Sequence, residues 1–306
     1  MTTDAPQNPT RRRMLAGAAA APMLANPPAR LIKGICWAIF PDGTPVVECV
    51  RRARNAGFDA LEVRVHTEGD ISLHSTAEDM KRLRDAAESN RIQIASLWVL
   101  TPSSPSLASP DPAVRKVAME RLKKGIELAP ALGCDALLAV PGVTGRGPKF
   151  EVNSEEAWTR ATAAFRAVLP AAGRAKVMLT PENVWSKFLV SPLDMKRFID
   201  QFRSPWVKAH FDTGNVMQFG YPQDWIEVLG SRIRRVHLKD YKLASGGTQG
   251  RFVPLLEGDV QWREVVASLI KTGYRGFVSA EVGPNPRDPE HIQKVSRAVD
   301  RILEMA

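Results

Sequence analysis

One unit repeats along most of the chain and limits the possible folds more than any other feature. Each unit is a short apolar run, a loop rich in Gly, Pro or Asp, and an amphipathic stretch opened by a helix-capping residue. Strands that alternate strictly with helices form a parallel sheet. The eight apolar runs are Leu31–Ile35, Ala60–Val65, Ile92–Leu97, Ala136–Val140, Lys176–Leu179, Val207–Phe211, Ile233–Leu238 and Gly276–Ala280.

The number of units favours a closed barrel over an open, doubly wound sheet. A chain of 306 residues is long enough for two domains, but α/β barrels of about 250 residues form a single one. No early strand is followed by a glycine-rich loop of a nucleotide-binding motif. The sequence therefore predicts an α/β fold with one (β/α)8 TIM barrel over residues 30–306.

Four expected helices have a clear starting signal. In each, a residue that caps helices well is followed by a proline, which suits the first helical turn. These pairs predict helix starts at Thr44-Pro45, Asp111-Pro112, Ser191-Pro192 and Asp288-Pro289.

The first 29 residues have the pattern of a twin-arginine-type signal peptide and linker. Arg11, Arg12 and Arg13 precede an Ala-rich apolar stretch over 16–24, and Pro27 and Pro28 follow it. The stretch is too short to span a bilayer, so no stable membrane insertion is expected. We expect export by the twin-arginine machinery and a periplasmic or otherwise exported location. The alternative is a basic tail on a cytoplasmic protein.

The charge pattern and the cysteines argue against a nucleic-acid-binding protein, a disulfide-stabilised protein and a protein with a structural zinc site. The net charge is +9, but the basic residues are scattered among acidic neighbours on helical segments, which indicates a solvated surface and no nucleic-acid partner. Cys36, Cys49 and Cys134 are far apart and form no Cys-x-x-Cys pair, which argues against a disulfide framework or a structural zinc site.

Four polar side chains occur where consecutive strands end. Chemistry in such barrels takes place at the carboxyl ends of the strands, where a polar residue without a function is costly. Each of the four alone has an ordinary structural explanation, such as an ion pair or a cap, but together they fit one divalent ion. Mn²⁺ or Mg²⁺ is favoured and Co²⁺ or Zn²⁺ is possible, although the absence of thiolate ligands weakens the case for zinc. The four are Glu182, Asp212, His237 and Glu281.

Further polar and aromatic residues are candidates for binding a substrate. Glu62 and Arg64 lie on the same face of the second strand, which predicts an ion pair at the barrel mouth, and His66 follows them. Trp98 and Trp185 are expected to form apolar walls. Lys239 and Arg251 are expected to bind a phosphate or a hydroxyl group, and Asn215 to donate a hydrogen bond to a hydroxyl.

Several segments resemble the sugar isomerase/epimerase family with a xylose-isomerase-like barrel. They are Pro181-Glu182-Asn183-Val184-Trp185, Phe211-Asp212-Thr213-Gly214-Asn215, Val236-His237-Leu238-Lys239-Asp240, Glu257-Gly258-Asp259-Val260-Gln261-Trp262 and Gly273-Tyr274-Arg275-Gly276 through Glu281. The family includes ketose 3-epimerases, ketose-phosphate 3-epimerases and hydroxypyruvate isomerases. The resemblance implies that Glu182, Asp212, His237 and Glu281 bind the metal and that the two glutamates also move the proton. Asn215 departs from the pattern, because many of these epimerases have a histidine there.

The resemblance implies divalent-metal-dependent epimerisation at C3 of a ketose or ketose phosphate through an enediolate, with Glu182 and Glu281 as the acid–base pair. An aldose–ketose isomerase of the hydroxypyruvate type and an inosose dehydratase-like lyase are alternatives. An AP endonuclease is disfavoured, because Asn215 and Gly250-Arg251-Phe252 lack histidine ligands that its zinc site needs. A non-catalytic sugar-binding barrel is a further alternative, and the chain is compatible with a homo-oligomer.

Overall fold

The computed structural model describes residues 1–2, 30–247 and 249–305, so nearly all of the expected signal segment lies outside the described residues. Eight parallel strands form the centre of the molecule, and each overlaps one predicted apolar run. They are β1 (Ile32–Cys36), β2 (Ala60–Arg64), β3 (Gln93–Leu100), β4 (Ala136–Ala139), β7 (Met178–Thr180), β8 (Ala209–Asp212), β9 (Ile233–Leu238) and β12 (Phe277–Ala280).

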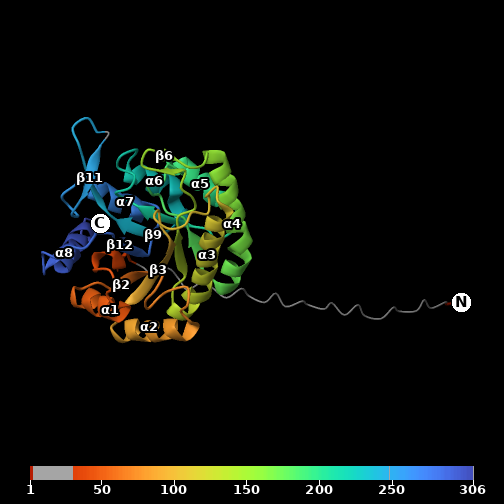
Figure 1. The fold of residues 1–306 in the computed structure, drawn as a ribbon, viewed down its shortest axis with the longest axis horizontal. Coiled ribbons are helices and arrows are strands. Elements are labelled where there is room, and N and C mark those ends of the chain that lie inside the picture. Colours follow the sequence, from red (N-terminus) through yellow and green to blue (C-terminus); the bar gives the residue numbers. More distant parts are fainter. Residues whose placement is uncertain (3–29, 248, 306) are drawn as a thin grey trace.

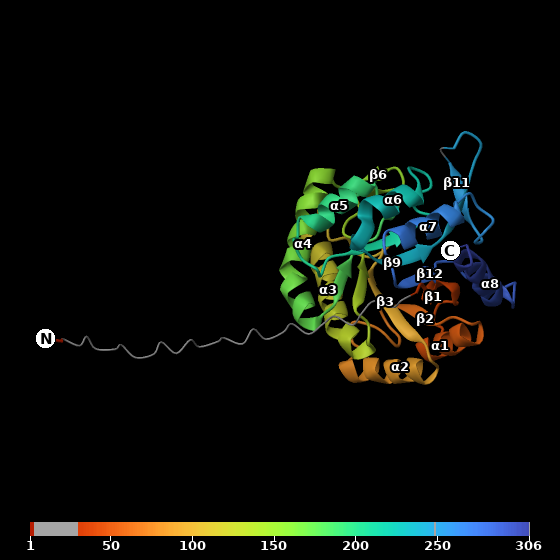
Figure 2. The same cartoon turned by 180° about the vertical axis from the view of Figure 1, so that it is seen from behind.

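The strand order shows how the sheet closes. Neighbouring strands follow the order β7-β4-β3-β2-β1-β12-β9-β8. Parallel bridges between Leu179 and Val207 and between Glu182 and His210 bring the two ends of this order together. The sheet is therefore a nearly closed barrel, as predicted, and Figures 1 and 2 show it from opposite sides.

Helices surround the barrel and cover its outer face (Figures 1 and 2). They are α1 (Val46–Asn55), α2 (Ala77–Ser89), α3 (Pro112–Leu132), α4 (Ser154–Ala175), α5 (Pro192–Asp200), α6 (Pro222–Leu229), α7 (Trp262–Lys271) and α8 (His291–Leu303), with short 3₁₀ turns η1 (Trp37–Ile39) and η2 (Gly230–Arg232). Their apolar faces pack on outward-facing strand residues such as Leu61, Val63 and Val65. None of the helices in the described ranges is both long and apolar enough to cross a membrane.

Two of the four expected helix starts are correct. The Asp111 carboxylate accepts from the Ala113 amide to cap α3, and the Ser191 hydroxyl accepts from the Asp194 amide to cap α5.

The other two starts are displaced toward the carboxyl end. Thr44 donates its hydroxyl to the Pro41 carbonyl, and α1 begins at Val46. The Asp288 carboxylate accepts from the Glu290 amide in a turn that precedes α8, which begins at His291. In both places the side chain stabilises a loop instead of capping a helix.

Two short hairpins lie beyond the carboxyl ends of the strands. One is β5 (Gly145–Arg146) with β6 (Lys149–Phe150), and the other is β10 (Asp240–Leu243) with β11 (Gly250–Val253). The second hairpin projects from the barrel in Figure 1. It follows directly after β9 and so begins beside His237.

A buried cation stabilises the amino-terminal half of the barrel interior. Arg235 is 1% exposed, donates from Nε to the Ala95 carbonyl at 2.6 Å and pairs with Asp135, as does Arg234. Burial opposes ionisation of Asp135, but the two guanidinium groups outweigh it and lower the pKa of this carboxyl. The ion pair thus compensates the charge that Arg235 brings into the barrel.

Candidate functional site

Four side chains from consecutive strands meet at one side of the barrel mouth. Asp212 ends β8, His237 lies next to the end of β9, and Glu182 and Glu281 follow β7 and β12. One potential ligand atom of each lies within 4.8 Å of those of the others. The structure therefore brings together all four residues singled out as metal ligands.

His237 lies at the centre of this cluster. Its Nδ1 is 2.9 Å from Oε1 of Glu182, 3.4 Å from Oε2 of Glu281 and 3.8 Å from Oδ2 of Asp212. Burial opposes protonation, but the carboxylates of Glu62 and Glu182 outweigh it and raise the pKa of His237 well above its usual range. Without another cation, the acidic surroundings favour the imidazolium.

The three carboxylates differ in their electrostatic surroundings. Burial raises the pKa of Asp212 well above its usual range and also raises the pKa of Glu182. Burial acts on Glu281 too, but the Lys239 ammonium outweighs it and holds the pKa of Glu281 well below its usual range. Lys239 donates from Nζ to Oε2 of Glu281 at 2.7 Å, and its Nζ is 3.6 Å from Oδ2 of Asp212.

The donor set of the cluster fits a divalent cation. Oδ2 of Asp212 is buried and has no hydrogen-bond partner among the described residues. Carboxylate oxygens and one imidazole nitrogen are ligands that Mn²⁺ and Mg²⁺ accept, and a cation offsets the repulsion between buried carboxylates. Glu182, Asp212, His237 and Glu281 are the residues that would hold it.

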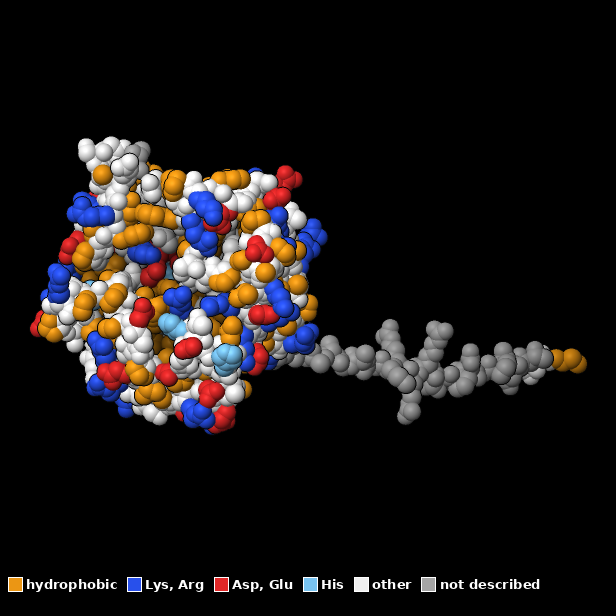
Figure 3. Space-filling view, in the orientation of Figure 1, with side chains coloured by type: hydrophobic (Ala, Val, Ile, Leu, Met, Phe, Trp, Pro, Cys, Tyr) orange, Lys and Arg blue, Asp and Glu red, His pale blue; other side chains and the backbone are white. Residues whose placement is uncertain are grey.

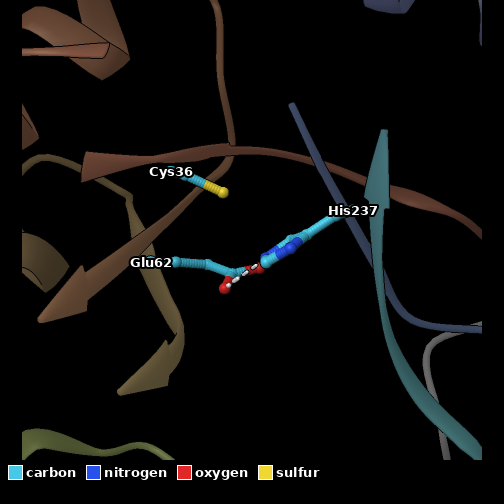
Figure 4. A group of neighbouring side chains, drawn as sticks. All are labelled: Cys36, Glu62 and His237. Carbon is cyan, nitrogen blue, oxygen red and sulfur yellow. Dashed lines mark hydrogen bonds and ion pairs between the residues drawn. The ribbon is translucent and has the colours of Figure 1, made fainter. Parts of the chain in front are cut away.

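Glu62 contacts the opposite edge of the His237 ring, as Figure 4 shows. Its Oε2 is 3.2 Å from Nε2 of His237, accepts from Nε1 of Trp98 at 2.7 Å and accepts from the hydroxyl of Ser96. The expected ion pair with Arg64 is wrong, because Glu62 is fully buried among these donors. Arg64 instead lies over the ring of Trp37, with Cζ 5.2 Å from the ring centroid.

Two further groups in the barrel interior escaped the sequence analysis. The sulfur of Cys36 points toward Glu62 and His237 (Figure 4), and burial raises the pKa of its thiol, which keeps it protonated. The His210 ring lies 4.0 Å from the His237 ring, and burial lowers its pKa well below the usual range. The alternation of strand side chains is a signal for His210, because it precedes Asp212 by two residues.

Aromatic side chains border the cluster on two sides. Trp98 is 6% exposed and its ring lies 5.1 Å from the His237 ring. Trp185 is 45% exposed, and its ring lies 4.9 Å from that of Phe252 on β11. Lys239 Nζ is 4.8 Å from the Phe252 centroid. Phe252, which the sequence analysis missed, therefore faces the site, and its neighbour Arg251 is exposed on the hairpin.

Asn215 has a structural role that the sequence analysis did not predict. Its amide Nδ2 donates to the Asn183 carbonyl at 3.0 Å, and its backbone N–H donates to Oδ1 of Asp212 at 2.7 Å. Asn183 in turn exchanges two hydrogen bonds with the Asp212 backbone. These bonds fix the orientation of Asp212, and the second hydrogen of the Asn215 amide remains a donor at the border of the groove, so donation to a substrate hydroxyl stays a prediction.

The mouth of the barrel is open beside the cluster. A groove of about 740 Å³ is bordered by Asn183, Trp185, Asn215 and Phe219, among others. Figure 3 shows a hollow in this face with acidic, basic and histidine side chains inside it. His66 lies elsewhere on the rim, where its ring is 5.0 Å from that of Trp37.

Comparisons with known proteins agree with this geometry. Residues 50–300 match the family model for the xylose isomerase-like TIM barrel. SgbU of Escherichia coli K12, named provisionally as an L-ribulose-5-phosphate 3-epimerase, is 28% identical over 243 residues, which are 75% of this chain and 81% of SgbU. UlaE of Salmonella paratyphi C, an L-ribulose-5-phosphate 3-epimerase, is 26% identical over 255 residues, 80% of this chain and 86% of UlaE.

A solved structure shares the fold at lower sequence identity. D-psicose 3-epimerase of Clostridium cellulolyticum H10, determined with D-tagatose, superposes with a TM-score of 0.74 at 17% identity and covers 90% of this chain and 99% of its own. The family match extends over most of the barrel and includes all four residues of the cluster. The chain therefore belongs to the xylose isomerase-like TIM barrel family.

Proposed function

We propose that the protein is a divalent-metal-dependent 3-epimerase of a ketose or ketose phosphate. The observation that carries this proposal is the placement of two glutamates, Glu182 after β7 and Glu281 after β12, within 3.4 Å of the same atom, Nδ1 of His237. The relatives named as ketose-phosphate 3-epimerases support the same reaction class.

The reaction needs an acid and a base on opposite sides of one carbon. A bound divalent cation supplies a positive charge that polarises the substrate carbonyl and makes the neighbouring C–H more acidic. One glutamate removes the C3 proton to give the enediolate, and the other delivers a proton to the opposite face of C3. One turnover leaves the protonation states of Glu182 and Glu281 exchanged, so they act in opposite roles in the reverse reaction, and proton exchange with solvent restores them for another forward turnover.

Residues around the glutamates position them for this exchange. Lys239 holds the Glu281 carboxylate by a charge-assisted hydrogen bond at 2.7 Å. The indole rings of Trp98 and Trp185 border the space beside the cluster. Their apolar surface favours contact with the C–H groups of a sugar over contact with bulk water.

Deuterium incorporation tests this proposal directly. Free ketoses and ketose phosphates are incubated with the purified protein and Mn²⁺ in D₂O, and the products are analysed by NMR. Epimerisation puts deuterium at C3 of the product. Deuterium only at C1 would instead assign aldose–ketose isomerisation, and no label in any sugar would overturn the assignment as an isomerase or epimerase.

A further inference from the structure

A second set of polar residues, centred on Arg64, lies at the rim of the barrel mouth, outside the four-residue cluster. Arg64 follows Glu62 by two residues on β2, so both side chains point toward the barrel axis, with Arg64 nearer the mouth. Arg64 lies over the ring of Trp37 of η1, which also contacts His66, and the charge of Arg121 on α3 acts on Arg64.

The donors of this group lack acceptors. Nε1 of Trp37 and Nε of Arg121 are both buried without a hydrogen-bond partner among the described residues. Within the same part of the chain, neither Arg64 nor Arg121 forms an ion pair, and Arg64 instead lies over the Trp37 ring. Buried donors without acceptors cost free energy, which a ligand that supplies acceptors would recover.

Positive charge exceeds negative charge at this rim. Burial and the charge of Arg121 lower the pKa of Arg64, and burial with the charge of Arg64 lowers the pKa of His66. The negative charge of Asp42 acts to raise the pKa of both Arg64 and His66. Asp42 forms no ion pair with either of them among the described residues. An anion would relieve the repulsion between the two arginines.

Two aromatic rings connect this group to the reaction centre. The Trp37 ring lies 6.3 Å from the Trp98 ring, which lies 5.1 Å from the His237 ring. A sugar with its reacting carbons beside His237 can extend across Trp98 toward Arg64. Figure 3 shows Lys or Arg side chains bordering the hollow on this face.

We propose that Arg64, Arg121 and the indole N–H of Trp37 form a subsite for an oxyanion at the end of the substrate opposite its reacting carbons. Guanidinium groups bind phosphate and carboxylate oxygens through charge-assisted hydrogen bonds. The ligand is therefore a sugar that carries a phosphate ester or a carboxylate. This subsite rests on the proposed function for the identity of the sugar, but its affinity for an oxyanion is independent of turnover.

Calorimetry with inorganic phosphate tests the subsite without any reaction. Phosphate is titrated into the full-length protein at saturating Mg²⁺, and the titration is repeated with Arg64→Met and Arg121→Met. We expect each variant to weaken phosphate binding by at least about tenfold, since each removes a charge-assisted donor. Arg166→Met is the matched control, because Arg166 also lies over an aromatic ring, that of Phe202, but on α4.

Further measurements separate the possible outcomes. Arg64→Lys keeps the charge and is expected to retain part of the affinity, which distinguishes lost recognition from misfolding. A second titration uses acetate in place of phosphate. If acetate binds more tightly than phosphate and its binding also depends on Arg64, the oxyanion of the substrate is a carboxylate and not a phosphate ester. Equal phosphate affinity in wild type, Arg64→Met and Arg121→Met would overturn the subsite, whereas a failure to epimerise any sugar would leave this measurement intact and overturn only the proposed function.

If the reaction is observed, kinetics provide a second readout. We expect the ratio of kcat/KM for a ketose phosphate over that for the free ketose to fall in Arg64→Met. An unchanged ratio would show that Arg64 does not recognise the phosphate.

Discussion

Nε2 of His237 lies 3.2 Å from Oε2 of Glu62, on the edge of the ring turned away from the carboxylate cluster. The same glutamate oxygen accepts from Trp98 and Ser96, so its position is fixed by donors from the neighbouring strand. A carboxylate on the outer nitrogen of a ligand histidine orients the ring and makes its other nitrogen more basic. The contact therefore directs Nδ1 of His237 toward the candidate metal position.

Glu62→Gln is expected to weaken Mn²⁺ binding by about 10–100-fold, the usual cost of losing such a partner. Isothermal titration calorimetry measures this affinity without turnover. Glu227→Gln serves as the control, because Glu227 pairs with Lys271 on the protein surface. If Glu62→Gln and Glu227→Gln bind Mn²⁺ as tightly as wild type, Glu62 does not support the ligand.

Replacing a direct ligand is expected to have a larger effect. His237→Ala or Asp212→Ala removes one of the four candidate ligands and should weaken binding of the divalent ion by more than about tenfold. Elemental analysis after dialysis measures the occupancy. His74→Ala is the control, since His74 is exposed in the loop between β2 and α2. Full occupancy in both ligand variants would rule out this site.

Glu182→Gln and Glu281→Gln keep the side-chain size but remove the group that carries the proton. General acid–base catalysis contributes about 10²–10⁴-fold, so each variant should lose at least that factor in kcat. Steady-state kinetics and the Mn²⁺ affinity are measured for each variant. A lower kcat at unchanged Mn²⁺ affinity indicates lost proton transfer, whereas a lower kcat with weaker Mn²⁺ binding indicates loss of the metal. A variant with normal metal content and normal kcat would remove that glutamate from the proposed mechanism.

Asp135→Asn is expected to destabilise the barrel in a pH-dependent manner. Because the pKa of Asp135 is lowered in the folded state, its ion pairs stabilise the protein above the pKa of an unfolded aspartate, about 4, and this stability is lost as the pH falls through the folded pKa. Asp135 is 39% exposed, so solvent screening limits the loss near pH 7 to about 1–2 kcal/mol. Urea unfolding at pH 7 and below pH 4 should show the difference from wild type shrinking. A constant difference would exclude the ion pairs as its cause.

The amino-terminal segment allows a test that does not depend on the barrel. We propose that residues 1–29 direct export of the folded protein. Replacing Arg11, Arg12 and Arg13 with lysine should then abolish export while leaving the protein folded in the cytoplasm. Cell fractionation with an antibody against the barrel measures both forms. Efficient processing and export of the triple variant would show that these arginines are not a signal.

The barrel and the four-residue cluster follow from local patterns in the sequence. A short apolar run, followed by a capped amphipathic stretch, specifies a strand and a helix without knowledge of distant residues. In a parallel barrel all strand ends meet at one face, so a polar residue at the end of a strand, such as Asp212 or His237, can be assigned to that face from the sequence alone.

Contacts across the barrel were decided only by the tertiary structure. Glu62 was expected to pair with Arg64, its neighbour on the same strand, but it binds His237 on β9 because the closed sheet brings β2, β3 and β9 around a common interior. Phe252 comes to the site because the β10–β11 hairpin folds back beside Lys239. The sequence determines on which side of a strand a residue lies. The residue that it contacts there depends on the curvature and closure of the whole sheet, and no local sequence pattern encodes these two properties.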